Sequence, residues 1–279
     1  GWLMIMADHR TVLMDDTSHP QSRRVFAKRS LGQNFLFDVN MARRIAAAIG
    51  PGAGPVLEIG PGRGALTAQL LAMGATPVMA LEKDRELAWE LKSAKPEVQV
   101  VLGDGLTFGW EGLAGLPGLR LIGNLPYNVA SPMLWEIVSR ARGWSRAVFM
   151  VQYEVGRRIV AAPGGKEYGA LSVWLQAFTS TRILFKVPPQ VFKPQPKIES
   201  AVIEFLPRPE AELPRHPQAL SRTLATCFQK RRKQLKSILK HLWNPTLEEG
   251  LRSRGIAPEA RPEELLVKDF LWLSGCIFA

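Results

Sequence analysis

Short apolar runs alternate with segments of helical periodicity over the first two thirds of the chain. Apolar residues recur every three or four positions from residue 39 to residue 49, where a Gly-Pro-Gly sequence ends the pattern, so this segment predicts a helix. The continuous apolar run that follows, residues 55–59, predicts a buried strand. The same alternation predicts further helices at 65–73, 87–94 and 132–140 and further strands at 77–81, 98–102, 119–123 and 147–151.

The predicted order of elements indicates the kind of sheet. Strands separated by helices pair in parallel through right-handed crossovers, so their carboxyl ends meet at one edge. Acidic residues stand at three of these ends: Glu58, Glu82 and Asp104. Because ligands of such sheets bind beside the carboxyl ends of the strands, we expect the three carboxylates to share one binding edge.

The pattern changes near residue 207. The α/β alternation persists to residue 205, residues 207–217 are rich in proline and charge, and helical periodicity follows at 218–243, 246–254 and 262–274. We therefore predict an α/β domain over residues 30–207 and a small all-helical domain over residues 208–279. Residues 1–29 lack a clean period and predict a poorly ordered N-terminal extension.

The charge of the chain favours a polyanionic partner. Its 279 residues include 36 Lys and Arg against 25 Asp and Glu, a formal net charge of +11. No apolar run approaches the roughly 20 residues of a membrane-spanning helix, and residues 1–6 are too short for a signal-peptide core. We therefore expect a cytoplasmic protein without membrane contact. Cys227 and Cys276 lack the spacing of a disulfide framework or a zinc site, so no metal is predicted.

A glycine-rich turn follows the first predicted strand of the α/β domain. Gly60, Gly62 and Gly64 stand between strand and helix, where small residues let the backbone approach a nucleotide-like ligand. A dinucleotide is one alternative, because Gly60, Gly62 and Ala65 also match the dehydrogenase fingerprint. Glu58, just before the turn, favours S-adenosylmethionine, since this cation tolerates a carboxylate that would repel a pyrophosphate.

The acidic strand ends have natural partners on that cofactor. Glu82 is placed to accept hydrogen bonds from both ribose hydroxyls, and Asp104 from the adenine amine, while Leu106 is a candidate to flank the ring. The alternative is that these acids are solvated strand ends.

The tetrapeptide Asn124-Leu125-Pro126-Tyr127 follows the fourth predicted strand of the α/β domain. An adenine amine is a poor nucleophile because its lone pair is delocalised into the ring, so its methylation needs acceptors that bind the N–H groups and keep the nitrogen pyramidal. Asn124 supplies a side-chain carbonyl, Leu125 and Pro126 supply backbone carbonyls, and Tyr127 can stack on the base. Such catalysis works by positioning, without a metal or a strong base. A plain turn is the alternative.

Four segments together resemble the small-subunit ribosomal RNA adenine dimethyltransferases. They are Gly-Gln-Asn-Phe-Leu at 32–36, Glu-Ile-Gly-Pro-Gly-Arg-Gly-Ala-Leu-Thr at 58–67, Asn-Leu-Pro-Tyr at 124–127 and Val-Phe-Lys-Pro-Gln-Pro-Lys at 191–197. The resemblance, which runs from about residue 29 to residue 240, implies a Rossmann-like class I S-adenosylmethionine-dependent methyltransferase domain with a small helical C-terminal domain. It also implies dimethylation of two adjacent adenines near the 3′ end of small-subunit rRNA during ribosome biogenesis.

The resemblance also implies roles for single residues. Gln33, Asn34 and Leu36 would close over the cofactor and join Gly60, Gly62, Glu82 and Asp104, with Asn124 catalytic. Phe192 would stack on the flipped target base opposite Tyr127. Tyr153 stands where the family pattern leads us to expect a lysine, which weakens any claim that this position contacts RNA.

A basic segment lies late in the chain. Residues 228–236 combine a cluster of cations with apolar residues at helical spacing, which predicts an amphipathic basic helix. A solvated face is the usual meaning of such a run, but no acid occurs between Arg222 and Glu248. We therefore predict phosphate contacts, and the predicted RNA-binding residues are Lys197, Lys230, Arg231, Arg232 and Lys233.

Three other functions share parts of this pattern. A methyltransferase that acts on large-subunit rRNA and confers antibiotic resistance has the same cofactor loop and a similar tetrapeptide, but the 191–197 segment and the basic segment favour the small subunit. A non-catalytic assembly or RNA-binding factor of the same fold is disfavoured by the intact tetrapeptide. A DNA adenine methyltransferase shares the tetrapeptide chemistry alone. We expect a monomer that acts on the assembling small subunit.

Overall fold

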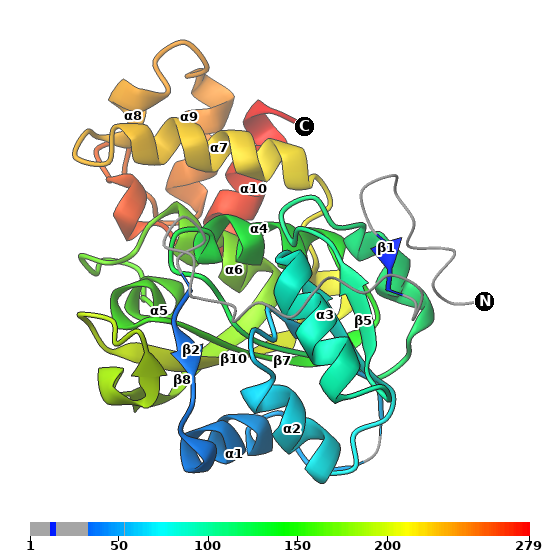
Figure 1. Ribbon diagram of the computed structural model, residues 1–279. Helices are drawn as coiled ribbons and strands as arrows, with labels where there is room; N and C mark the ends of the chain where they lie inside the picture. Colours follow the sequence, from blue (N-terminus) through cyan, green and yellow to red (C-terminus); the bar gives the residue numbers. More distant parts are fainter. Residues whose placement is uncertain (1–11, 15–32, 53) are drawn as a thin grey trace. The chain divides into compact units, whose positions relative to one another are not determined.

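The computed structural model describes residues 12–14, 33–52 and 54–279 and shows two compact units (Figure 1). The first unit comprises Gly1–Gly156 and Arg182–Pro207, and the second comprises Arg157–Thr181 and Arg208–Ala279. The division differs from the predicted domains in one respect, because residues 157–181 belong with the C-terminal helices. The predicted extension, residues 1–29, lies almost entirely outside the described residues.

The first unit is built on a mixed sheet. Its strand order is β1 (Val12–Leu13), β5 (Gln99–Leu102), β4 (Val78–Glu82), β3 (Val56–Ile59), β6 (Leu119–Asn124), β7 (Trp144–Gln152), β10 (Ser200–Pro207) and β8 (Thr179–Val187). The five strands from β5 to β7 are parallel, as predicted. The order reverses at β3, which pairs with both β4 and β6, so the sheet has its topological switch point between β3 and β6.

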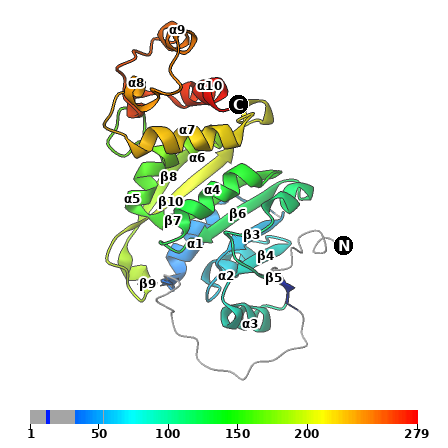
Figure 2. The ribbon, with the colours of Figure 1, turned by 90° about the horizontal axis from the view of Figure 1, so that it is seen from above.

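Helices cover both faces of this sheet. On one face α1 (Val39–Ala47), α2 (Ala65–Ala72) and α3 (Arg85–Ala94) bury Ile45, Leu70 and Ala88 in one apolar cluster with alternate strand residues such as Val56 and Val78. On the opposite face lies α4 (Ala130–Arg140), which Figure 2 shows on the other side of the sheet from α2 and α3, and the short η2 (Trp110–Gly115) packs against α4. Burial on both sides explains why β3 and β4 are continuously apolar except at Glu58 and Glu82.

A small ribbon stands apart from the main sheet. After the turn η3 (Pro189–Val191), strand β9 (Phe192–Lys193) pairs antiparallel with β2 (Phe35–Leu36), with Phe35 opposite Lys193 and Leu36 opposite Phe192. This pairing brings the described part of one segment of the sequence resemblance, residues 33–36, beside another, residues 191–197, although they are far apart in the chain.

The second unit is helical. It contains the end of α5 (Tyr153–Ile159), then α6 (Ala170–Phe178), η4 (Glu210–Glu212), α7 (Pro217–Gln229), α8 (Leu235–Ile238), α9 (Pro245–Ser253), η5 (Pro262–Glu264) and α10 (Val267–Ile277). Helix α6 packs against both α7 and α10. The ring of Phe228 lies 6.5 Å from that of Tyr168 and 5.5 Å from that of Phe270, and the Tyr168 hydroxyl donates to the Leu265 carbonyl. These contacts tie residues 157–181 to the C-terminal helices.

The predicted helix over residues 218–243 is wrong. Helix α7 ends at Gln229, residues 230–234 form a turn, and α8 begins only at Leu235. Hydrogen bonds to residues distant in sequence stabilise this turn. Arg231 donates to the Glu263 carboxylate at 2.6 Å and to the Gly165 carbonyl at 3.2 Å. The Leu235 N–H donates to the Ala260 carbonyl. The amphipathic basic helix predicted over 228–236 is therefore absent.

The other predicted elements of residues 39–151 and 246–254 are confirmed to within a few residues. The last predicted helix, 262–274, starts instead at Val267, after the short turn η5. In the part of the chain that the structure describes, none of the helices combines the length and apolar character needed to cross a bilayer.

Candidate active site

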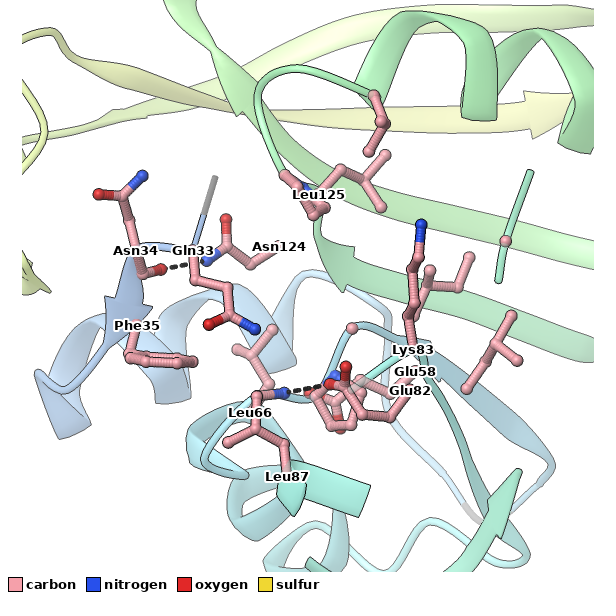
Figure 3. Close-up of a pocket in the computed structure, with 18 of the residues that line it drawn as sticks. Gln33, Asn34, Phe35, Glu58, Leu66, Glu82, Lys83, Leu87, Asn124 and Leu125 are labelled. Atoms are coloured by element: carbon pink, nitrogen blue, oxygen red, sulfur yellow. Dashed lines mark hydrogen bonds between the residues drawn. The ribbon is translucent and has the colours of Figure 1, made fainter. Parts of the chain in front are cut away.

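One pocket lies at the carboxyl ends of the central strands of the first unit. Five chain segments supply most of its lining: residues 33–36, the turn around 58–66, the ends of β4 and β5, and residues 124–129. Leu87 of α3 and Met133 of α4 complete it. These are the elements on either side of the topological switch point, where open α/β sheets bind their ligands. Figure 3 shows Gln33, Asn34, Glu82 and Asn124 gathered around the pocket from three different parts of the chain.

The turn beside this pocket contains three glycines, so its backbone carries no side chains at these positions. Gly60, Gly62 and Gly64 have φ values of 66°, 55° and 76°, a region that favours glycine. A Cβ on Gly62 would lie 3.1 Å from the Phe35 ring, and one on Gly64 would lie 2.9 Å from a Leu91 methyl. Side chains at these positions would therefore strain the turn and crowd the pocket, which explains the predicted need for small residues.

Glu82, at the end of β4, is buried and held by backbone donors. Its Oε2 accepts from the Gly62 N–H at 3.1 Å and its Oε1 from the Asp84 N–H at 2.8 Å. Burial raises the pKa of this carboxyl despite these bonds. Each carboxylate oxygen can accept more than one hydrogen bond, so Glu82 keeps capacity for a pair of hydroxyl donors.

Glu58 lies in the same pocket and is only 1% exposed. Its Oε2 accepts from the Thr67 hydroxyl at 2.6 Å. Burial raises the pKa of Glu58 to about 7, and the Thr67 hydrogen bond opposes that effect. The carboxyl therefore changes charge near neutral pH, and a cationic ligand would favour its ionised form.

Asp104, at the end of β5, is fixed by two donors. Lys83 Nζ lies 2.7 Å from its Oδ2, and the Leu106 N–H donates to its Oδ1 at 3.0 Å. Burial tends to raise the pKa of Asp104, but the Lys83 ammonium and the Leu106 N–H outweigh it, so the pKa is lowered. Leu106 itself is not among the residues that line the pocket. Its role in the structure is to orient Asp104 through its backbone.

Asn124 ends β6, and its side chain is hydrogen-bonded to the backbone of Asn34. Its Nδ2 donates to the Asn34 carbonyl at 3.0 Å, the bond drawn in Figure 3. This bond directs the amide nitrogen toward residues 33–36 and leaves Oδ1 as an acceptor. Gly123 permits the arrangement, because a Cβ there would lie 2.4 Å from the Ile59 carbonyl oxygen of the neighbouring strand. The next residue, Leu125, is tied to β7 through its N–H, which donates to the Met150 carbonyl.

Tyr127, the last residue of the tetrapeptide, also lines the pocket. Its hydroxyl is hydrogen-bonded to the Ser200 hydroxyl at 2.7 Å, at the start of β10. Burial raises the pKa of the phenol, so Tyr127 stays neutral in the physiological range. The ring is half-buried, and with its far end anchored it can present a face to a base. Ser200 was not predicted, and its type and position in the sequence carry no signal of this contact.

Phe192, predicted to stack on the target base, is buried in the structure. It is 2% exposed and belongs to the apolar cluster under α1 and α2, beside Leu36. It is not among the residues that line the pocket. An aromatic ring in a hydrophobic strand pair is stabilised by that burial, so Phe192 contributes packing to the β2–β9 ribbon here. Lys197, further along the same segment, is exposed and outside the pocket.

Several pocket residues escaped the sequence analysis, among them Phe35, Lys83, Leu87 and Met133. Phe35 stands inside a quoted motif, and Arg63 lies over its ring with 5.0 Å to the centroid. Lys83 directly follows Glu82, a position that by itself gives no hint of an ion pair with the next strand. Within residues 12–14, 33–52 and 54–279, no group of three or more His, Cys, Asp or Glu could hold a metal ion.

Known proteins resemble this chain closely. A family model described as ribosomal RNA adenine dimethylase matches residues 25–277. The small-subunit rRNA methyltransferase A of Oleidesulfovibrio alaskensis is 51% identical over 257 residues, 90% of this chain and 91% of that protein. The protein with the same description from Nitratidesulfovibrio vulgaris (strain Hildenborough) is 50% identical over 256 residues, 90% of this chain and 96% of that protein.

Solved structures agree on the fold. A dimethyladenosine transferase from Plasmodium falciparum superposes with a TM-score of 0.72 and 24% identity, covering 85% of this chain and 95% of that chain. The 23S rRNA methyltransferase ErmE superposes with a TM-score of 0.64 and 26% identity, covering 88% of this chain and 100% of that chain. The predicted Rossmann-like class I methyltransferase fold is confirmed.

Proposed function

The chain belongs to the ribosomal RNA adenine dimethylase family, and we propose that the pocket at the switch point of its sheet is where it methylates adenine. The enzyme uses S-adenosylmethionine to dimethylate adenine amines in small-subunit rRNA, a step of ribosome biogenesis. We assign its target to two adjacent adenines near the 3′ end of that RNA. The observation that carries the assignment of the site is the juxtaposition of Asn124 with Asn34, Glu82 and Asp104 in one pocket.

The pocket residues fit the proposed cofactor. Glu82 would accept hydrogen bonds from the ribose hydroxyls, and Asp104 would accept one from the adenine amine. The glycine turn at Gly60 and Gly62 would lie against the methionine part of the cofactor. Buried Glu58 suits a cation and would repel a pyrophosphate. Gln33, Asn34 and Leu36 line the same pocket and would cover the bound molecule. When bound, S-adenosylmethionine supplies an electrophilic methyl group.

The tetrapeptide loop would handle the target base. Asn124 Oδ1 and the backbone carbonyl of Leu125 or Pro126 would accept from the two N–H groups of the adenine amine, which keeps its lone pair available for the methyl carbon. The Pro126 carbonyl already accepts from the Val129 N–H at 3.1 Å. Tyr127, anchored by Ser200, would stack on the base. After transfer the amine carries an extra proton, which water can take up. This chemistry requires orientation more than acid–base catalysis.

RNA contact is assigned to the turn at residues 230–234 of the second unit. Lys230, Arg232 and Lys233 are exposed there, whereas Arg231 is bound to Glu263 and Gly165. The three exposed cations, and exposed Lys197 in the first unit, suit phosphate groups. Such contacts position the enzyme on RNA without reading its sequence. Because this substrate is in the cytoplasm, we assign the enzyme to that compartment, and because one chain supplies the whole pocket, we assign it as a monomer.

The large-subunit alternative has one structural relative in its favour, the 23S rRNA methyltransferase ErmE at 26% identity. The relatives described as small-subunit methyltransferases are about twice as similar, at 50% and 51% identity over 90% of the chain. The small subunit is therefore the favoured substrate.

The test is transfer of labelled methyl groups from S-adenosylmethionine to small subunits isolated from a strain that lacks the modification. Nucleoside analysis of the product should give dimethyladenosine in small-subunit RNA, with large subunits and DNA unlabelled. Label in large-subunit RNA would contradict the proposal. Tight binding of small subunits without any label would point to a non-catalytic assembly factor.

A further inference from the structure

Lys83 connects the ends of two neighbouring strands inside the pocket. It follows Glu82 at the end of β4, lines the pocket, and places its ammonium 2.7 Å from Asp104 Oδ2 at the end of β5. Figure 3 shows its extended side chain along the pocket wall beside Glu82. The side chain is 56% exposed, so burial does not force it into this conformation.

The ion pair limits what Asp104 can do. With Leu106 N–H on Oδ1 and Lys83 on Oδ2, the carboxylate has one donor on each oxygen and a fixed orientation. Each oxygen still has a lone pair for one more donor. The other charged side chains that line the pocket are Glu58, Glu82 and Arg63, and Lys83 is the cation at ion-pairing distance from Asp104.

An ionised, oriented Asp104 distinguishes purines by the group at their position 6. An adenine amine donates N–H groups to a carboxylate, whereas the oxygen of a 6-oxo purine would face a negative charge and lose its hydrogen bond. A carboxyl that is protonated or free to rotate would discriminate less, because its O–H can donate to the oxygen. Whatever holds Asp104 ionised therefore contributes to recognition of the adenine ring.

We propose that Lys83 is a positioning residue for the adenine of the cofactor: its ammonium holds Asp104 as an ionised acceptor, and its methylene chain forms one wall of the adenine subsite. This inference rests on the proposed assignment of the pocket to S-adenosylmethionine. It explains why a half-exposed lysine lies over an acidic strand end in a pocket that already contains two buried carboxyls.

The test compares three variants by calorimetric binding of S-adenosylhomocysteine and of its 6-oxo analogue, S-inosylhomocysteine. Lys83→Met keeps the apolar chain and removes the charge, Lys83→Arg keeps the charge, and Lys95→Met removes a lysine that does not line the pocket. Lys83→Met should bind S-adenosylhomocysteine about 3- to 10-fold more weakly and should prefer it less strongly over the 6-oxo analogue. Lys83→Arg should largely restore both properties, and Lys95→Met should match the wild type.

The pH profile provides a second readout that loss of packing would not move. Lys83 lowers the pKa of Asp104, so the wild type should keep its affinity further into acid than Lys83→Met, whose affinity should begin to fall at higher pH. Titration of Glu58 and Glu82 affects both proteins alike and cancels in their ratio. Equal affinity ratios and coincident pH profiles would overturn the role of Lys83. Failure of the wild type to bind S-adenosylhomocysteine would instead overturn the proposed cofactor site.

Discussion

Asn124 shows how one hydrogen bond can prepare a side chain for chemistry. Because its Nδ2 is bound to the Asn34 carbonyl, its Oδ1 is held in one orientation before any ligand arrives. Asn124→Ala removes that acceptor, and we expect methyl transfer to fall by about 100-fold or more, the scale seen when one transition-state hydrogen bond is lost. Cofactor affinity should change far less, because Glu82 and Asp104 remain.

Single-turnover methylation and cofactor binding, measured on the same preparation, separate these two effects. Asn124→Asp is the matched variant, since it keeps an acceptor oxygen and loses the donor to Asn34. Methylation by Asn124→Ala at the wild-type rate would remove Asn124 from the mechanism.

Glu58 gives the pocket a measurable pH dependence. Its pKa is raised from 4.5 to about 7 by burial, so the folded protein retains a proton that the unfolded chain releases between these values. Stability from this group is therefore highest at acidic pH and falls as the pH rises through about 7. At pH 8 the ionised, buried carboxylate costs on the order of 3 kcal/mol, which Glu58→Gln should recover.

Urea unfolding of the cofactor-free protein at pH 5 and pH 8 tests this expectation. Glu58→Gln should be close to the wild type at pH 5 and clearly more stable at pH 8. A stability difference that is the same at both pH values would show that Glu58 does not titrate between them.

Several site residues were predictable because their positions follow from the sheet. Glu58, Glu82, Asp104 and Asn124 stand at carboxyl ends of strands, and parallel pairing brings those ends together whatever the details of packing. Lys83 and Ser200 were not predictable, because their contacts depend on side-chain conformations and on a partner 21 or 73 residues away in sequence. The predicted stacking of Phe192 on the target base stays a prediction; the structure shows this ring buried in the apolar cluster.

At the scale of elements, the turn at residues 230–234 carries the clearest prediction. Its cations divide into one that holds the turn, Arg231, and three that are exposed, Lys230, Arg232 and Lys233. Replacing the three exposed cations by Gln should weaken RNA binding and reduce the slope of log affinity against log salt by about 2 to 3. Thermal stability should stay near that of the wild type.

Arg231→Gln is the contrasting variant. It should lower the free energy of unfolding by about 0.5–1.5 kcal/mol, since it removes the partly exposed ion pair with Glu263 and one of two donors to the Gly165 carbonyl, which keeps the Tyr168 N–H. Filter binding over a salt series and thermal unfolding measure the two properties. An unchanged salt slope in the triple variant would place the RNA surface elsewhere.

Periodicity could not reveal this turn. Apolar residues stay at helical spacing across it, so the sequence reads as one helix from 218 to 243. What ends α7 is a set of bonds to residues 165, 260 and 263, which are distant in sequence. The parallel strands of residues 55–151 were predictable for the opposite reason. Each is a local apolar run, and helices alternate with these runs along the chain.

At the scale of the whole molecule, the chain does not divide at a single point. A change in composition near residue 207 predicted two consecutive domains, yet residues 157–181 belong to the same unit as the C-terminal helices. Composition could not show this, because α6 is apolar enough to suit either unit. Its membership is decided by packing against α7 and α10 and by the hydrogen bond from Tyr168 to Leu265.

This division predicts that a fragment ending at residue 207 is not an independent domain. The fragment keeps α6 but loses α7 and α10, against which α6 packs. The apolar side chains of α6 that pack against these two helices would then face water, at about 1.5–3 kcal/mol for each large one. We expect the fragment to bind a hydrophobic dye and to aggregate, whereas the full chain stays monodisperse in light scattering. A fragment that unfolds cooperatively and stays monomeric would show instead that the first unit is complete at residue 207.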